Sequence, residues 1–215
     1  MRITHLGHAA VLVEAAGRRV LIDPGNFSSD WHGLSGLDAV CITHQHPDHV
    51  DPDHLPRLLD ANPSARVWVE ADVHLTCQHE RMEPLGAGER RGLGELTIAA
   101  HGGRHAVIHA DIPRIGNIGL TFEAPGEPVF FHPGDSLEAV PAGVDVLAIP
   151  IYGPWAAMKE TIDFVRAVGA PLGFPIHEGL LNERGWSLIF GRLNSMTATR
   201  TRDLRSGEAW APQLS

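Results

Sequence analysis

The chain has 215 residues, 43% of them apolar and 20% charged, which favours one soluble globular domain over residues 1–215 with a sizeable buried core. Its net charge of −9 argues against nucleic acid as a partner, because such binding needs a basic surface, and no apolar run approaches the length that crosses a membrane. Its two cysteines give no disulfide framework and residues 1–5 lack the basic and apolar regions of a signal peptide, so we expect a cytoplasmic protein.

The chain begins with three short predicted strands at residues 2–6, 10–14 and 18–22. Three strands in close succession suggest an antiparallel meander. The third strand ends at Asp23, in front of a Pro-Gly pair that is typical of a turn.

Three imidazoles and a carboxylate come directly after residues 37–42, an apolar run that is typical of a buried strand. His44 and His46 are two positions apart, which puts both side chains on one face of an extended segment, where they can hold one divalent metal ion. Asp48 and His49 are adjacent, so they point toward a second spot a short distance away. The spacing therefore predicts ligands for two metal ions.

The middle of the chain combines a helix with several strands. A helix is predicted after Asp51, with Leu55, Leu58 and Leu59 on its apolar side. Residues 71–93 have no clear periodicity and are expected to form surface structure. Strands are predicted at residues 66–69, 95–100, 106–109 and 117–122.

The second half of the chain places two further candidate ligands at the ends of strands. Strands are predicted at residues 128–131, 144–150 and 172–176, helices at 154–168 and 178–194, and a closing hairpin at 198–201 and 208–210. Asp135 follows the first of these strands and His177 the last, where ligand-binding side chains gather in α/β folds. Two strand-rich halves with helices outside them predict an α/β fold, a four-layer αββα sandwich of two mixed sheets flanked by helices.

The stretch His44-x-His46-x-Asp48-His49 resembles the signature of the metallo-β-lactamase superfamily. Further elements of that family occur in its order over nearly the whole chain: Leu21-Ile22-Asp23-Pro24-Gly25, Gly103-Arg104-His105-Ala106, His132-Pro133-Gly134-Asp135 and Pro175-Ile176-His177. Together with the signature they make the resemblance specific. It implies the family's αββα fold, in agreement with the pattern of strands and helices.

The resemblance also implies a ligand set. Metal one would take His44, His46 and His105, metal two would take Asp48, His49 and His177, and Asp135 would bridge the two ions or lean to one of them. In the family, an Asp at the position of Asp23 supports the metal loop by hydrogen bonding and is rarely a ligand. His105 is preferred to His101 because the lactonase-like branch has its ligand in a Gly-x-x-His-Ala-x-x-His context.

Two more histidines are placed near the metals by the same resemblance. The Gly7-His8-Ala9 segment is similar to the opening of the lactonase-like (ascorbate-6-phosphate lactonase-like) branch, and a purely structural role for His8 is the alternative. His109 recurs in the context of that branch and would contact substrate or orient a ligand. Catalytic roles are therefore expected for Asp48, His8 and His109, with Asp48 holding the nucleophile or carrying its proton.

Aromatic side chains in loops are candidates for a substrate pocket. Trp31 and His32 fall in the loop at residues 26–36, and Tyr152 and Trp155 fall at a turn between a strand and a helix. Trp31 either lines a pocket or caps the core. The spacing of Trp155 also fits the buried face of the helix that follows.

The donor set indicates the chemistry. Imidazole and carboxylate ligands without thiolate suit two Zn²⁺ ions, with Mn²⁺ or Fe²⁺ as alternatives. Two such ions would acidify a bridging water, so that hydroxide can attack a carbonyl group at neutral pH. We therefore expect a metal-dependent hydrolase that acts on a small lactone, ester or related substrate. A homo-oligomer is compatible with the sequence. The alternatives are a small-molecule phosphodiesterase of the same fold and a non-catalytic metal-bound binding protein.

Overall fold

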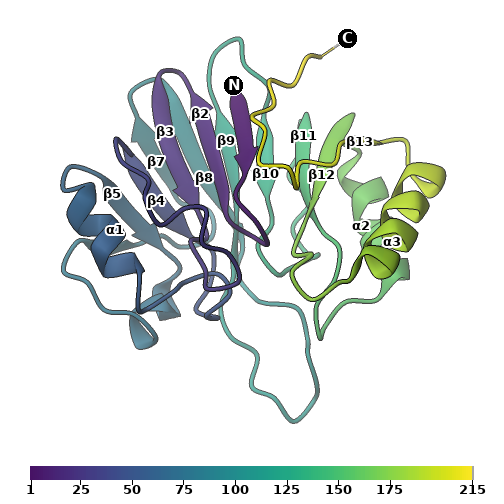
Figure 1. Ribbon diagram of the computed structural model, residues 1–215, viewed down its shortest axis with the longest axis horizontal. Coiled ribbons are helices and arrows are strands. Elements are labelled where there is room, and N and C mark those ends of the chain that lie inside the picture. The colour runs from purple at the N-terminus through teal and green to yellow at the C-terminus, as the bar shows by residue number, and fades with distance from the viewer. Residues whose placement is uncertain (215) are drawn as a thin grey trace.

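Two β-sheets lie face to face in the computed structural model, which describes residues 1–214 (Figure 1). The first sheet has the strand order β1-β2-β3-β4-β5-β6. Its strands are β1 (Arg2–His5), β2 (Val11–Ala15), β3 (Arg18–Ile22), β4 (Ala39–Ile42), β5 (Arg66–Val69) and β6 (Met82–Pro84). The first three strands form the predicted antiparallel meander, and β3 to β6 run parallel to one another.

The second sheet has the strand order β13-β12-β11-β10-β9-β8-β7. Its strands are β7 (Arg90–Leu93), β8 (Leu96–Gly102), β9 (Ile118–Glu123), β10 (Phe130–His132), β11 (Val146–Pro150), β12 (Leu172–Ile176) and β13 (Arg200–Thr201). Neighbours from β7 to β10 are antiparallel, and neighbours from β10 to β13 are parallel. Both sheets are mixed, as the sequence predicts.

Helices cover the outer face of each sheet (Figure 1). The helix α1 (Leu55–Ala61) packs on the first sheet, and α2 (Met158–Val168) and α3 (Glu183–Met196) pack on the second. A short 3₁₀ helix, η1 (Ala71–Leu75), follows β5. The predicted αββα sandwich is therefore confirmed. Within residues 1–214, no helix combines the length and the apolar character that crossing a membrane requires.

The alternation of side chains along each strand builds three apolar layers. In β3, Val20 and Ile22 belong to the core between the two sheets, while Leu21 packs with the leucines of α1. In β10, Phe130 faces the same central core and Phe131 faces α2 and α3. Every residue of the central strands β4, β11 and β12 is apolar or glycine and buried, so the polar side chains next to them lie in the loops that follow these strands.

Residues 106–109 are not a strand, contrary to prediction. They belong to a long loop, residues 103–117, that projects beyond the sandwich between β8 and β9 (Figure 1). The backbone N–H of Ala106 donates to the carbonyl of Asp135, and that of His105 donates to the carbonyl of Ile115. These backbone groups are therefore used within the loop and against the neighbouring loop rather than in a strand ladder.

Both helices of the second half begin later than predicted. The helix α2 starts at Met158 rather than at residue 154, because the indole of Trp155 turns away to hydrogen-bond Asp135. The helix α3 starts at Glu183 rather than at residue 178. Its N-cap is Asn182, whose side chain accepts hydrogen bonds from the backbone N–H groups of the first turn.

The predicted closing hairpin is wrong, because the two segments join different sheets. The strand β13 adds to β12 of the second sheet in parallel. Trp210 instead pairs with Ile3 of the first sheet through two backbone hydrogen bonds. The end of the chain therefore ties the two sheets together.

Candidate metal centre

The predicted ligands meet at one end of the sandwich, in the loops that follow the strands. His44, His46, Asp48 and His49 follow β4, Asp135 follows β10, His177 follows β12, and His105 lies in the loop after β8. Carboxyl ends of strands are where α/β folds place their sites, because several loops converge there. All seven residues predicted to ligate metal fall into two adjoining clusters.

The first cluster consists of His44, His46, His105 and Asp135, and each contributes one donor atom within 4.8 Å of the others. His44 Nε2 lies 3.1 Å from His46 Nδ1. His105 Nε2 lies 3.5 Å from Asp135 Oδ2. These are the residues predicted for metal one, together with the predicted bridge.

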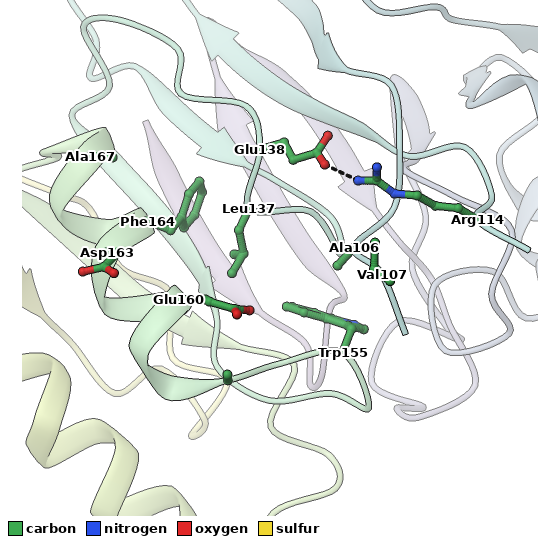
Figure 2. Close-up of a pocket in the computed structure, with 11 residues that line it drawn as sticks. Ala106, Val107, Arg114, Leu137, Glu138, Trp155, Glu160, Asp163, Phe164 and Ala167 are labelled. Atoms are coloured by element: carbon green, nitrogen blue, oxygen red, sulfur yellow. Dashed lines mark hydrogen bonds and ion pairs between the residues drawn. The ribbon is translucent and has the colours of Figure 1, made fainter. Parts of the chain in front are cut away.

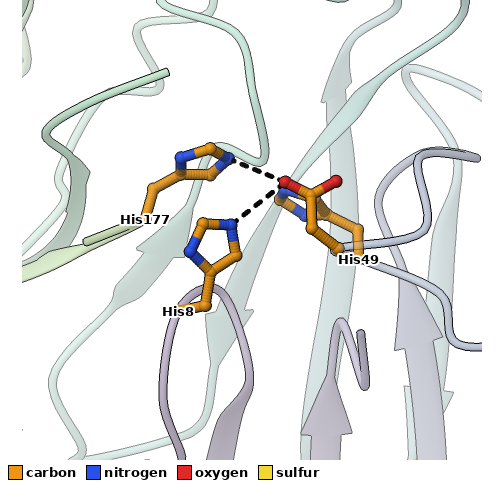
Figure 3. A group of neighbouring side chains, drawn as sticks. His8, His49 and His177 are labelled. Atoms are coloured by element: carbon orange, nitrogen blue, oxygen red, sulfur yellow. Dashed lines mark hydrogen bonds and ion pairs between the residues drawn. The ribbon is translucent and has the colours of Figure 1, made fainter. Parts of the chain in front are cut away.

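The second cluster contains Asp48, His49 and His177, joined by His8 (Figure 3). His177 Nε2 lies 3.5 Å from Asp48 Oδ2. Asp135 reaches this cluster too, with Oδ1 3.1 Å from His49 Nε2 and Oδ2 3.0 Å from His177 Nε2. Asp135 therefore lies between the clusters, where a bridging carboxylate would lie.

Several donor atoms of the two clusters are buried without a hydrogen bond: His49 Nε2, His105 Nε2, His177 Nε2 and Asp135 Oδ1. A buried polar atom left unpaired costs about 1–3 kcal/mol. The ligands of a tetrahedral zinc ion lie about 3.3–3.5 Å apart, given bonds of about 2.0–2.1 Å. The distances of 3.0 to 3.5 Å across these clusters therefore fit metal ions that satisfy the unpaired atoms.

A buried carboxylate, Asp23, orients the ligands that follow β4. Its Oδ1 accepts the backbone N–H of Thr43, and its Oδ2 accepts both the hydroxyl of Thr43 and Nδ1–H of His49, all at 2.7 Å. Because the Thr43 hydroxyl donates to Asp23, its oxygen accepts Nδ1–H of His44 at 3.0 Å. Both imidazoles are thereby oriented with Nε2 directed into the clusters, so that Nε2 is the atom available to a metal ion when the ring is neutral.

The ligands from the second sheet are fixed by backbone carbonyls. Nδ1–H of His105 donates to the carbonyl of Ala106 at 2.7 Å. Nδ1–H of His177 donates to the carbonyl of Tyr152. Each hydrogen bond keeps a proton on Nδ1, so that the neutral ring would present an unprotonated Nε2 to a metal ion.

His8 differs from the ligands in its tautomer. Its Nδ1 accepts the backbone N–H of Gly179 at 3.1 Å, so the ring proton lies on Nε2. That Nε2–H donates to Asp48 Oδ2 at 3.1 Å (Figure 3). The backbone of His8 is held in the left-handed region, with φ of 53°, by a hydrogen bond from its N–H to the Glu178 carboxylate. Its geometry therefore favours a proton donor to Asp48 over a metal ligand.

Some predicted residues lie outside the clusters. The side chain of His109 is 64% exposed on the long loop, where its Nδ1 accepts the backbone N–H of Asp111. His109 therefore contacts neither cluster, and the catalytic role expected for it stays a prediction. Trp31 is fully buried and donates to the carbonyl of Gly25, so it belongs to the core rather than to a pocket. His101 bonds Thr121 in β8–β9, away from the clusters.

Three residues support the clusters through contacts that the sequence did not predict. Trp155 was placed in a pocket or the core, yet its Nε1–H donates to Asp135 Oδ2 at 2.8 Å. Asn117 accepts the backbone N–H of Asp135, and Glu178 holds the backbone of His8. The only sequence signal for Glu178 was its place directly after His177.

The charges of the centre are strongly coupled. Burial opposes the charge of Asp135, but His177 and His49 outweigh it and hold the pKa of this carboxyl well below its usual range. Burial likewise opposes the charge of His177, but Asp135 and Asp48 raise its pKa to about 9. Asp135 and Asp23 raise the pKa of His49 well above its usual value against the effect of burial.

These shifts predict proton release on metal binding. A metal ion binds neutral imidazole, whereas a pKa of about 9 keeps His177 protonated at pH 7 in the metal-free protein, and the pKa of His49 is raised as well. We expect at least about one proton released per ion bound at the second cluster at pH 7, and an affinity that rises with pH toward 9. Calorimetry in buffers of different ionisation enthalpy measures this release. No release at pH 7 would contradict the raised pKa values.

The tautomer of His8 predicts that it is dispensable for metal binding. His8→Ala should retain the full metal content, whereas His177→Ala should lose the ion of the second cluster. Elemental analysis after dialysis against zinc compares the two variants with the unaltered protein. Loss of one equivalent from His8→Ala would make His8 a ligand.

Comparison with known proteins agrees with this geometry. The sequence model of the family described as "Beta-lactamase superfamily domain" matches residues 2–177. Protein Rv0786c of Mycobacterium tuberculosis is 42% identical over 201 residues, covering 93% of this chain and 94% of that protein. A UPF0173 metal-dependent hydrolase of Aeropyrum pernix is 35% identical, covering 83% of this chain and 82% of its own.

A solved structure supports the fold independently of sequence. The metallo-β-lactamase fold protein YhfI of Bacillus subtilis superposes with a TM-score of 0.74 at 15% identity, covering 97% of this chain and 98% of its own. Its likeness concerns the fold alone. From the family match, the relatives and the ligand clusters together, the chain belongs to the metallo-β-lactamase superfamily and, within it, to the UPF0173 family of metal-dependent hydrolases.

Proposed function

We propose that this metal-dependent hydrolase works with two metal ions, preferably zinc, and cleaves a small lactone, ester or related carbonyl compound. The observation that carries the proposal is the pair of clusters that share Asp135, each with buried donor atoms that lack a hydrogen bond. A single ion would leave one group of lone pairs unsatisfied, which is costly in a buried site. The choice of a lactone or ester follows from the resemblance of Gly7-His8-Ala9 to the opening of the lactonase-like branch.

The residues divide into two ligand sets around the shared carboxylate. His44, His46 and His105 would hold the first ion, Asp48, His49 and His177 the second, and Asp135 would contact both. When bound, such ions polarise a carbonyl oxygen and acidify water. Imidazole and carboxylate donors without thiolate favour Zn²⁺, and Mn²⁺ and Fe²⁺ are the alternatives.

The protein's own groups handle the proton. Burial lowers the pKa of His8, so this imidazole is neutral at pH 7 and presents Nε2–H to Asp48. Although burial opposes it, the contacts with His177 and His8 hold the pKa of Asp48 below its usual range, so Asp48 stays an acceptor. Asp48 would accept a proton from the attacking water and pass it to the leaving group, while Nε2–H of His8 keeps its proton and orients the carboxylate of Asp48.

Access to the centre is from the side of Asp48 and His46. The side chain of Asp48 is 19% exposed and His46 is half-buried, whereas His44, His49, His105 and His177 are buried. A substrate approaching from this side meets Asp48 first, whereas His8 is buried. Water and substrate therefore reach the carboxylate that would hold the proton.

A carbonyl substrate is favoured over a phosphodiester by the charges around the site. Arg114 already donates to the carbonyl of His105 and pairs with Glu138 (Figure 2). Its guanidinium is thus engaged rather than free to bind phosphate. The net charge of −9 would also slow the encounter with a polynucleotide.

The test is turnover by the zinc-loaded protein of lactones, aryl esters, a bis-aryl phosphodiester and single-stranded RNA. We expect metal-dependent hydrolysis of a lactone or ester, reduced about 10–100-fold by His8→Ala, which removes the hydrogen bond that orients Asp48. The control His101→Ala removes a histidine that bonds Thr121 and should retain full activity.

Two outcomes would overturn the proposal. Faster cleavage of the phosphodiester or RNA, abolished by Asp135→Ala, would favour the phosphodiesterase alternative. Full metal loading without turnover of any class would favour a metal-bound binding protein.

A further inference from the structure

A cavity of about 640 Å³ opens beside the metal centre, a volume typical of small-molecule sites (Figure 2). It lies between the start of α2, the long loop and the segment after Asp135. Trp155, Phe164 and Leu137 provide its apolar surface. The cavity therefore offers a compact apolar compound two aromatic side chains to pack against.

One wall of the cavity is shared with the metal centre. Trp155 lines the cavity, and its indole N–H donates to Asp135 Oδ2 at 2.8 Å. Its ring centroid lies 5.9 Å from that of His177 and 6.3 Å from that of His105. Ala106 also lines the cavity while its backbone N–H donates to the carbonyl of Asp135. A molecule held here is next to the clusters.

The charged groups of the cavity are predominantly acidic. Three carboxylates, on Glu138, Glu160 and Asp163, line it with one guanidinium, on Arg114, which leaves a net charge of −2 (one minus three). Arg114 is paired with Glu138. The remaining two carboxylates stand on successive turns of α2 and face no cation that lines the cavity.

Of these two carboxylates, Glu160 has the fewer cationic neighbours. Asp163 has Arg166 at 4.0 Å, an ion pair exposed to solvent on both sides. Within residues 1–214, Glu160 has no ion pair closer than 4.0 Å, and Figure 2 shows it reaching from α2 toward Trp155. Its place in the first turn of α2 also suits the helix dipole, which is the competing, structural reason for a carboxylate there.

We propose that the substrate of this site is a small apolar or aromatic compound that carries a protonated amine away from the bond that is cleaved. The apolar part packs on Trp155 and Phe164, and the ammonium group lies at Glu160. The Trp155 ring adds a favourable face for a cation. The inference rests on the proposed hydrolase function, whose centre adjoins the cavity. It disfavours phosphorylated and other anionic substrates, which would meet the carboxylates of α2.

The test compares two probes of matched size with the zinc-loaded protein: 2-phenylethylamine, which is protonated at neutral pH, and 2-phenylethanol, which is neutral. Nitrogen-15 spectra follow the indole N–H signals of the five tryptophans, and Trp155→Phe identifies that of Trp155. We expect the amine to bind about fivefold more tightly, the range of a solvent-exposed ion pair, and to shift the Trp155 signal. The preference should shrink with added salt.

Two variants separate local from overall charge. Glu160→Gln should bring the two probes to nearly equal affinity. Asp60→Asn removes one charge from the exposed side of α1 and should keep the preference. Thermal unfolding of Glu160→Gln reports the structural role at the helix terminus separately, because stability and probe preference are measured independently.

Equal binding of the two probes, an amine preference that survives Glu160→Gln, or a Trp155 signal that does not move would each overturn the inference. Because the readout is binding, it does not depend on turnover. A protein that prefers the amine but hydrolyses no ester or lactone would contradict the proposed function alone. A protein that hydrolyses esters without an amine preference would contradict this inference alone.

Discussion

The hydrogen bonds of the Asp23 carboxylate decide how the centre is held. Asp23 is fully buried, and an unpaired charge there would cost several kcal/mol, so its three hydrogen bonds are a condition for this arrangement. They connect the end of β3 to Thr43 and His49 after β4. The turn that carries Asp23 packs so closely that a Cβ on Gly25 would lie 1.8 Å from the carbonyl oxygen of Asp48. Only glycine permits this approach.

The orientation of the candidate ligands depends on this carboxylate and on two backbone carbonyls. Asp23 fixes the tautomers of His49 and, through Thr43, of His44, while carbonyls of Ala106 and Tyr152 do the same for His105 and His177. Each ring is thereby oriented with Nε2 facing inward before any ion arrives. The buried hydrogen bonds orient the rings and leave the inward-facing donor atoms without a hydrogen bond, so that a cation is their natural partner.

The sequence was sufficient to predict the fold class and which candidate ligands lie together, for a physical reason. Strand periodicity sorts Val20, Leu21 and Ile22 into layers, and ligands such as Asp135 and His177 directly follow buried strands. Both signals are local in the chain.

What the sequence missed depends on contacts between distant segments. The indole of Trp155 bonds a carboxylate 20 positions away, and the tautomer of His8 is set by Gly179, 171 positions away. The loop that replaces the strand predicted at residues 106–109 is likewise held by Asp135, from the loop after β10. No periodicity or spacing reports such bonds, and the helical spacing of Trp155 even favoured a different role.

The long loop after β8 has a thermodynamic consequence. It carries the candidate ligand His105. Further along, the same loop carries Val107 and Arg114, which line the cavity. An ion that restrains His105 therefore restrains the cavity wall as well, and a molecule seated against that wall restrains the ligand. Because the same segment is ordered in both events, metal binding and binding in the cavity are reciprocally linked. The factor by which the ion raises the affinity of the cavity for its ligand equals the factor by which that ligand raises the affinity for the ion.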